Sequence, residues 1–344
     1  VVGIAKNDDI VEIINSVMLD KRVVTFGDKL CHNMEGDKLQ STLPHYAYLR
    51  IADGCSNKCS YCAIPLIRGK MRSRKMENII EEAKKFAENG VKELVIVAQD
   101  VTAYGIDLYK KYALPELLKQ LCKIDGIKWI RLLYCYPERM TDELIETIKT
   151  EDKVLNYIDI PIQHCNKEIL RNMYRGGDEQ SLRELFAKLR REIPDVVLRT
   201  TLITGFPGET EEQFSELAEF VNDIKFERLG CFAYSAEEDT PAAEMPDQID
   251  EGERQRRADI ITSEQEIRMG EYYAGMVGNT YEVVCEGFDR YSDMYFGRSM
   301  HFAPEIDGMI YFTSAKDKSP LTIGDFVNVK ITDVLENNLL GERV

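Results

Sequence analysis

The chain has 344 residues, enough to bury a full-sized core and to form more than one domain. It carries 60 acidic and 44 basic residues, and a net charge of −16 repels nucleic-acid phosphate and attracts basic partners, although acidity can also serve solubility alone. The longest apolar runs are strand-sized and too short to cross a bilayer. Nine cysteines without the spacing of a disulfide framework favour reduced thiols. We therefore expect a cytoplasmic protein with no membrane partner.

The first 44 residues do not have the pattern of a complete domain. Ile10, Ile13, Ile14 and Val17 recur at helical spacing, but no second strong element follows before residue 45. We expect residues 1–44 to be the tail of a truncated N-terminal domain and a linker to the main body.

A repeating pattern of apolar, β-branched runs then begins. The runs occupy residues 46–51, 93–99, 129–134, 157–162, 196–203 and 229–234. Most are separated by segments of helical period, such as the one that Thr210 and Gln213 open as a capping box. Six strand–helix repeats predict a parallel sheet with right-handed crossovers. We expect an α/β fold, an open or partial β/α barrel of six strands over residues 45–275, with its chemistry at the carboxyl ends of the strands.

The pattern changes after the sixth run. Residues 250–276 form a long, charged helical segment that no parallel strand follows, and we assign it to the barrel as a trailing helix. From about residue 276, short alternating runs are separated by turn residues. This pattern predicts a small antiparallel β domain over residues 276–344.

Three cysteines, Cys55, Cys59 and Cys62, follow directly on the first predicted strand. A structural zinc wants four ligands, and the nearest further donors are His45 and Cys31. A complete ferredoxin-type cluster wants a fourth thiolate nearby, which this stretch does not offer. The third alternative is a four-iron cluster on three thiolates, with one iron left open for a ligand or substrate.

The spacing C-x₃-C-x₂-C after the first strand of a β/α barrel resembles the radical S-adenosylmethionine superfamily. The resemblance implies a [4Fe–4S] cluster on Cys55, Cys59 and Cys62, with the amino and carboxylate groups of S-adenosylmethionine on the open iron. An electron from the cluster then cleaves the sulfonium to a 5′-deoxyadenosyl radical. Tyr61 matches the aromatic position beside the adenine, and its alternative is a packed loop aromatic.

The later strand ends present further candidates for binding the cofactor. The superfamily often has a Gly-Gly-Glu-like stretch for the methionyl amine after the second strand, and this chain departs from it there. Arg199 and Thr201 are candidates for the carboxylate or ribose, and Gly205 would let the backbone approach the ligand. A strand–turn–helix connection would also need the glycines and proline of residues 205–208. The candidate cofactor-binding residues are Tyr61, Gln99, Asp100, Gln163, Arg199, Thr201 and Gly205.

Several stretches together resemble the methylthiotransferases, including "RIADGCSNKCSYCAIPLIRGKMRSR", "VAQDVTAYGIDLY" and "TGFPGETEEQF". The resemblance covers the chain from about residue 45 to its end, with the terminal β domain in the position of a TRAM domain. It implies insertion of a methylthio group into an unactivated C–H bond, with sulfur delivered through a second [4Fe–4S] cluster. That cluster belongs to an N-terminal domain that we expect this chain to lack.

Two branches of this family act on different substrates, and the residues favour one of them. One modifies a tRNA adenosine beside the anticodon, and the other modifies the β-carbon of an aspartate in small-subunit ribosomal protein twelve. The stretches "AQDVTAYGIDL", "PIQHCNKEIL" and "APEIDGMIYF" resemble the second branch.

Charge also favours the branch that modifies the ribosomal protein. Residues 276–344 carry 11 acidic and 6 basic residues, a net charge of −5. An acidic domain suits a basic ribosomal protein and does not suit nucleic acid. The expected partners are therefore that ribosomal protein and an electron donor such as flavodoxin or ferredoxin. The alternatives are a tRNA methylthiotransferase and a non-catalytic, metal-bound binding module.

Overall fold

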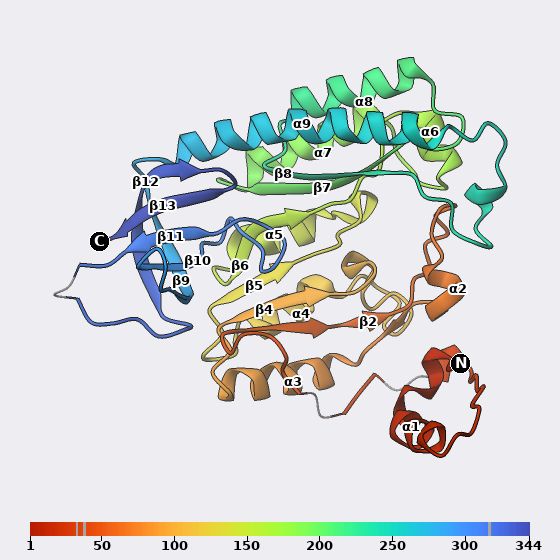
Figure 1. Cartoon of the computed structure of the whole chain (residues 1–344), viewed down its shortest axis with the longest axis horizontal. Coiled ribbons are helices and arrows are strands. Elements are labelled where there is room, and N and C mark those ends of the chain that lie inside the picture. Colours follow the sequence, from red (N-terminus) through yellow and green to blue (C-terminus); the bar gives the residue numbers. More distant parts are fainter. Residues whose placement is uncertain (32–33, 37–38, 316–317) are drawn as a thin grey trace.

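The computed structural model describes residues 1–31, 34–36, 39–315 and 318–344. Figure 1 shows an N-terminal segment with α1 (Ile10–Met18), a central body built on a sheet, and a small β barrel at the C-terminal end. Helix α9 (Glu251–Met276) runs along the body and reaches the β barrel. Among the described residues, no helix combines the length and apolarity that spanning a membrane requires.

The N-terminal segment lies beside the body and contributes no residue of α1 to a buried core. The predicted helix is confirmed, and its apolar side chains Ile10, Val11, Ile14 and Val17 are exposed. A bridge between Val2 and Thr25 closes the segment on itself.

The six predicted strands form one parallel sheet, in the order β1-β4-β5-β6-β7-β8, which confirms the open β/α barrel. The strands are β1 (Tyr46–Arg50), β4 (Glu93–Val97), β5 (Trp129–Leu132), β6 (Val154–Asp159), β7 (Val197–Thr204) and β8 (Arg228–Ala233). The strand predicted over residues 157–162 begins and ends three residues earlier, as β6. Its C-terminal end was misplaced because the apolar run continues beyond Asp159 into a buried loop. Pro161 there has no N–H to donate to a ladder.

The connecting helices cover one face of the sheet, and their apolar stripes form the main core with alternate strand residues. These helices are α3 (Met76–Glu88), α4 (Leu114–Leu121), α5 (Asp142–Thr150), α7 (Glu179–Glu192) and α8 (Glu211–Ile224), with the short α2 (Ile64–Arg68) and α6 (Lys167–Asn172). The predicted capping box of α8 is confirmed: the Thr210 N–H donates to Gln213 at 3.0 Å, and the Gln213 N–H donates to the Thr210 hydroxyl at 3.3 Å.

The C-terminal domain is a closed barrel of five strands in the order β10-β11-β13-β12-β9. They are β9 (Thr280–Asp289), β10 (Met294–Arg298), β11 (Ile310–Thr313), β12 (Phe326–Leu335) and β13 (Asn338–Arg343). Neighbouring strands run antiparallel as predicted, except β11 and β13, which run parallel. Closure pairs every strand on both sides and leaves no sheet edge.

This barrel packs against the other face of the parallel sheet, at the amino-terminal end of the strands. Tyr46, Trp129 and Tyr157 of the sheet share a core with Val284 and Ala303 of the barrel. A buried ion cluster joins the two parts as well. Arg298 donates to Glu93 at 2.8 Å and to Glu286 at 2.7 Å, and Arg131 donates to Glu93 at 2.7 Å.

Burial alone would raise the pKa of Glu93, but Arg298 and Arg131 together lower it to about 2. The carboxylate is therefore charged and fully paired. The barrel covers the amino-terminal end of this face of the sheet, and the carboxyl ends of the strands lie away from it.

Candidate functional site

A cavity of about 470 Å³ lies at the carboxyl ends of the parallel strands. This volume falls in the range of sites for small ligands and cofactors. Its walls come from the ends of β1, β4, β5 and β6, from β7, and from the loop that carries the three cysteines. The lining residues include Arg50, Cys55, Asn57, Cys59, Tyr61, Cys62, Gln99, Tyr134, Tyr136, Gln163, Arg175 and Thr201.

The cysteine loop is bracketed by β2 (Ala52–Asp53) and β3 (Arg72–Ser73), which pair antiparallel. Gly54 turns the chain with φ of +74°, and a Cβ there would lie 2.5 Å from the carbonyl oxygen of Lys70. At the far side of the loop, the N–H and hydroxyl of Ser60 donate to carbonyls of Met173 and Asn172 at 3.0 and 2.7 Å. The backbone of the loop is thus fixed before any metal binds.

All three predicted cysteines line the cavity, and none of them is in a disulfide. Burial raises the pKa of the Cys55 thiol to about 11 and also raises the pKa of Cys62. These two thiols are therefore protonated at neutral pH, and a metal that binds them must displace the protons. Three thiols on the wall of one cavity fit a cluster that keeps a coordination position open.

The other donors considered for a zinc site lie elsewhere. His45 sits at the start of β1, where its Nε2 is 3.1 Å from Glu286 in the C-terminal barrel. The side chain of Cys31 falls outside what the structure describes. Within the described ranges, no three His, Cys, Asp or Glu side chains are gathered closely enough to hold one metal ion.

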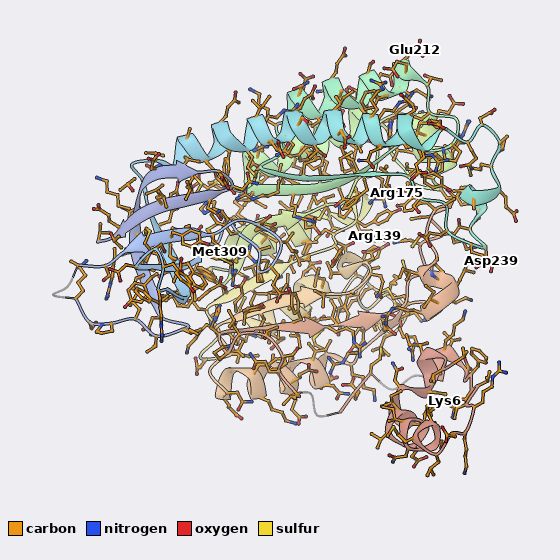
Figure 2. The ribbon with its side chains drawn as sticks, in the orientation of Figure 1. Lys6, Arg139, Arg175, Glu212, Asp239 and Met309 are labelled. Atoms are coloured by element: carbon orange, nitrogen blue, oxygen red, sulfur yellow. The ribbon has the colours of Figure 1, made fainter. Side chains whose placement is uncertain are left out.

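Two arginines and an aromatic ring form a cluster against the cysteine loop. The guanidinium groups of Arg175 and Arg139 lie 4.2 and 4.7 Å from the ring centroid of Tyr136, and Figure 2 shows both arginines at the end of the sheet near α2. Arg175 also donates to the Pro161 carbonyl at 2.7 Å and to the Tyr61 hydroxyl at 3.4 Å. The ring of Tyr61 is thereby held in the cavity wall.

Gln99 and Asp100 follow β4 and have different surroundings. The Gln99 side chain lines the cavity, and its Oε1 is buried without a hydrogen-bond partner. Asp100 is buried behind the wall, where its carboxylate accepts from Asn57 at 2.8 Å and from Arg139 at 2.6 Å. Because Asn57 lies between the first two cysteines, Asp100 holds the cysteine loop in place.

Gln163 and Thr201 line the cavity, whereas Arg199 does not. The Arg199 guanidinium donates to Asp159 at 2.7 Å, and the same carboxylate accepts from the backbone N–H of Tyr134 at 2.9 Å. Gln163 and Tyr134 both have positive φ, +71° and +63°, which is uncommon for residues other than glycine. Backbone strain of this kind is concentrated at functional sites.

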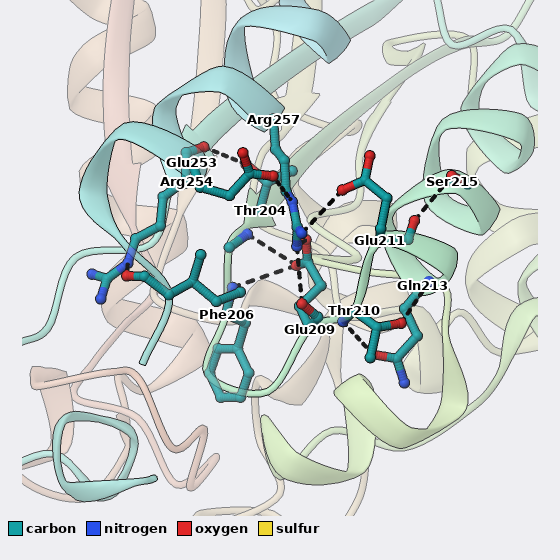
Figure 3. A network of polar contacts seen from close by, with 12 residues as sticks. Thr204, Phe206, Glu209, Thr210, Glu211, Gln213, Ser215, Glu253, Arg254 and Arg257 are labelled. Carbon is teal, nitrogen blue, oxygen red and sulfur yellow. Dashed lines mark hydrogen bonds and ion pairs between the residues drawn. The ribbon is translucent and has the colours of Figure 1, made fainter. Parts of the chain in front are cut away.

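Gly205 also lies outside the cavity lining and belongs to a buried polar network, which Figure 3 shows from close by. Its φ is +71°, and a Cβ there would lie 2.5 Å from Cγ of Arg254 on α9. The Gly205 N–H donates to Glu209 at 2.9 Å, and Arg257 of α9 donates to the other Glu209 oxygen at 2.8 Å. The turn after β7 is therefore locked to the trailing helix.

Arg50, Tyr136 and Arg175 are among the lining residues that the sequence pattern did not predict. Arg50 had a signal that could have found it, because it is a charged residue at the end of an otherwise apolar strand. Tyr136 lies in the loop after β5 and Arg175 lies beyond helix α6, and the fold brings the two side chains together.

Similarity to known proteins shows to which superfamily of enzymes the chain belongs. The family model "Radical SAM superfamily" matches residues 49–221, half of the chain, and the "TRAM domain" model matches residues 277–344. Coproporphyrinogen III oxidase (HemN) from Escherichia coli, described as a radical SAM enzyme, has the same fold, with a TM-score of 0.50 at 18% identity over 67% of this chain and 54% of that one. The chain belongs to the radical S-adenosylmethionine superfamily, which implies a [4Fe–4S] cluster and S-adenosylmethionine.

Curated relatives narrow the family further. Ribosomal protein uS12 methylthiotransferase RimO of Caldanaerobacter subterraneus subsp. tengcongensis is 48% identical over 99% of this chain and 77% of its own length. The proteins of the same name from Clostridium botulinum strain Hall and Thermoanaerobacter sp. strain X514 are 50% and 46% identical, over 89% and 99% of this chain and 68% and 77% of their own lengths. The chain belongs to the RimO family of methylthiotransferases, as the sequence motifs predicted.

Proposed function

We propose that the chain acts in methylthiolation of ribosomal protein uS12, at the β-carbon of an aspartate. The observation that carries the proposal is the position of Cys55, Cys59 and Cys62 on the wall of a cavity at the carboxyl ends of the strands. Chemistry in β/α barrels is located at this end. Membership of the RimO family supports the substrate.

The three cysteine thiolates would hold the cluster. When bound, the cluster would supply the electron that cleaves S-adenosylmethionine, and the adenosyl fragment released with methionine would take one hydrogen atom from the substrate. Asp100 and Arg139 act through Asn57 to keep the cysteine loop in position. Buried hydrogen bonds to charged groups of this kind contribute about 1.5–3 kcal/mol each to stability.

Four other lining residues, Tyr61, Gln99, Gln163 and Thr201, would bind and orient the cofactor. The unpartnered amide oxygen of Gln99 is suited to accept a hydrogen bond from the methionyl amine. The ring of Tyr61 offers a flat apolar face for the adenine, and Gln163 and Thr201 offer hydrogen bonds to the ribose. Each of these assignments remains a prediction that substitution can test.

Arg199 and Gly205 would act indirectly. Arg199 fixes Asp159, which holds the backbone of Tyr134 in its left-handed conformation at the cavity wall. Gly205 lets the turn after β7 pack against α9. Apolar side chains of Ala52, Ile64 and Val97 complete the wall, and a cavity with such walls excludes water from reactive species.

Further components of the reaction remain proposals. We propose that the second [4Fe–4S] cluster has its ligands in the part of the relatives that has no counterpart in this chain, since the chain covers 77% and 68% of the first two. A reducing protein such as flavodoxin or ferredoxin would supply electrons. Reduced cysteines and a ribosomal substrate both fit a cytoplasmic enzyme.

The experiment is anaerobic reconstitution of the full-length enzyme with iron and sulfide, followed by incubation with S-adenosylmethionine and reductant. Recombinant uS12 and total tRNA serve as separate substrates, and mass spectrometry reads the gain of a methylthio group. We expect the gain on one aspartate of uS12 and none on tRNA. A gain on tRNA alone, or activity that survives a Cys59→Ala substitution, would contradict the proposal.

A further inference from the structure

Arg50 is the last residue of β1, and its half-buried side chain lines the cavity. Within the part of the chain that the structure describes, its guanidinium makes no hydrogen bond, ion pair or ring contact. The other arginine of the lining, Arg175, is bound to Pro161 and Tyr61 and stacks on Tyr136. Arg50 therefore offers a cation whose hydrogen-bonding capacity is unused.

The backbone of Arg50 is held firmly although its side chain is not. Arg50 is in register with Val97 of β4, and the Ile51 N–H donates to the Val97 carbonyl at 3.0 Å. The buried Arg74 donates to the Arg50 carbonyl at 2.7 Å. A rigid strand end thus presents the guanidinium to the cavity, as a precise binding site requires.

The cavity wall is positively charged, whereas the protein as a whole is negatively charged. The chain has a net charge of −16, yet none of the described lining residues is an Asp or a Glu, and two are Arg. A partly buried guanidinium without a counter-charge is costly, and its planar fork matches a carboxylate with two parallel hydrogen bonds. The Arg50 guanidinium is therefore suited to bind a carboxylate in the cavity.

We propose that Arg50 binds the side-chain carboxylate of the substrate aspartate. This inference rests on the proposed function, in which the reacting atom is the β-carbon of that aspartate. The β-carbon is bonded directly to the carboxylate carbon, so a bidentate pair with Arg50 fixes the reacting atom to within one bond. Such positioning lowers the barrier by holding the reactants in a near-attack geometry.

S-adenosylmethionine carries a carboxylate too, and the experiment must separate these two sources. The probes are a fluorescein-labelled peptide with the sequence around the target aspartate of uS12 and the same peptide with Asn in place of the aspartate. The proteins are the cluster-loaded full-length enzyme, its Arg50→Gln and Arg50→Lys variants, and Arg191→Gln as a matched control. Arg191 is an exposed residue of α7, and among the described residues its guanidinium forms an ion pair only with the neighbouring Glu192.

Two quantities are measured for each protein. The first is the equilibrium affinity for each peptide in the presence of S-adenosylmethionine, from fluorescence anisotropy. The second is the KM for S-adenosylmethionine in the peptide-independent formation of 5′-deoxyadenosine. Iron content and circular dichroism show that each variant is folded and loaded, and Arg50→Lys, which keeps the charge, serves if Arg50→Gln does not fold.

We expect Arg50→Gln to weaken binding of the Asp peptide by about 10- to 100-fold, the loss of one charge-assisted hydrogen-bonded pair. Binding of the Asn peptide and the KM for S-adenosylmethionine stay unchanged, and Arg50→Lys recovers part of the preference for Asp. Unchanged preference for Asp in Arg50→Gln would overturn the inference. A raised KM for S-adenosylmethionine with unchanged peptide affinity would also overturn it and would assign Arg50 to the cofactor. If the wild type modifies neither peptide nor intact uS12, the proposed function itself fails.

Discussion

The ion pair between Arg257 of α9 and Glu209 in the turn after β7 predicts that the substitution Arg257→Met lowers the stability of the fold. The Arg257 side chain is 6% exposed and donates to the Glu209 carboxylate at 2.8 Å and to the Glu209 carbonyl at 3.0 Å. Glu209 is fully buried and has no other cation within hydrogen-bonding distance among the described residues. Methionine keeps the apolar stem of the side chain and removes the charge.

Removing one member of a buried ion pair costs about 3–5 kcal/mol, because the other charge is left without compensation. When the 344 residues unfold as one cooperative unit, with an unfolding entropy of about 2 cal/mol/K per residue, this loss lowers the melting temperature by about 4–7 °C. Burial already raises the pKa of Glu209 above 4.5, and loss of Arg257 raises it further. A carboxyl with a raised pKa in the folded state loses stability as pH rises, so the deficit is larger at pH 8 than at pH 5.5.

Differential scanning calorimetry at the two pH values measures this deficit. The neighbouring Arg256→Met is the control, because Arg256 is 47% exposed and pairs with Glu211 and Glu253 at the surface. Exposed pairs contribute little, so the control stays near the wild type. The double variant Arg257→Met/Glu209→Gln recovers part of the loss, since no buried charge remains. An Arg257→Met protein as stable as the control, or a deficit that shrinks as pH rises, would refute this reasoning.

Three further predictions follow from the same structure. Cys59→Ala loses most bound iron and all 5′-deoxyadenosine formation while keeping its circular dichroism spectrum, and retention of a full cluster would contradict the ligand assignment. Burial lowers the pKa of His164 to about 3, so between pH 7 and pH 5 the wild type loses roughly 2 kcal/mol of unfolding free energy that His164→Gln does not lose, as denaturant titrations would show. Arg298→Met leaves Glu93 and Glu286 short of a buried cation at the contact between the two parts, and calorimetry should show a loss of about 3–5 kcal/mol.

Much of the fold could be predicted from the sequence, because each element has a local signal. The six apolar runs gave six parallel strands, and the pair Thr210 and Gln213 gave the start of α8. The parallel pairing of β11 and β13 could not be predicted, because it depends on how the barrel closes and no local pattern encodes closure.

The candidate site shows the same division. The cysteines were found because their spacing is itself the signal, and Gln99 and Gln163 were found because they closely follow the ends of β4 and β6. Arg199 and Thr201 both lie within β7, yet the Thr201 side chain lines the cavity whereas the Arg199 guanidinium binds Asp159 behind the wall. The direction in which a strand side chain points depends on residues far away in the sequence. The group that pairs with its charge is also set by such residues.

The central claim is that three thiolates of this chain hold a four-iron cluster with one iron open to S-adenosylmethionine. Electron paramagnetic resonance of the reconstituted, reduced protein, with and without S-adenosylmethionine, tests it most directly. We predict the signal of a reduced [4Fe–4S] cluster whose line shape changes when the cofactor is added. A spectrum that the cofactor leaves unchanged, or a colourless protein that holds zinc on these cysteines, would contradict the claim.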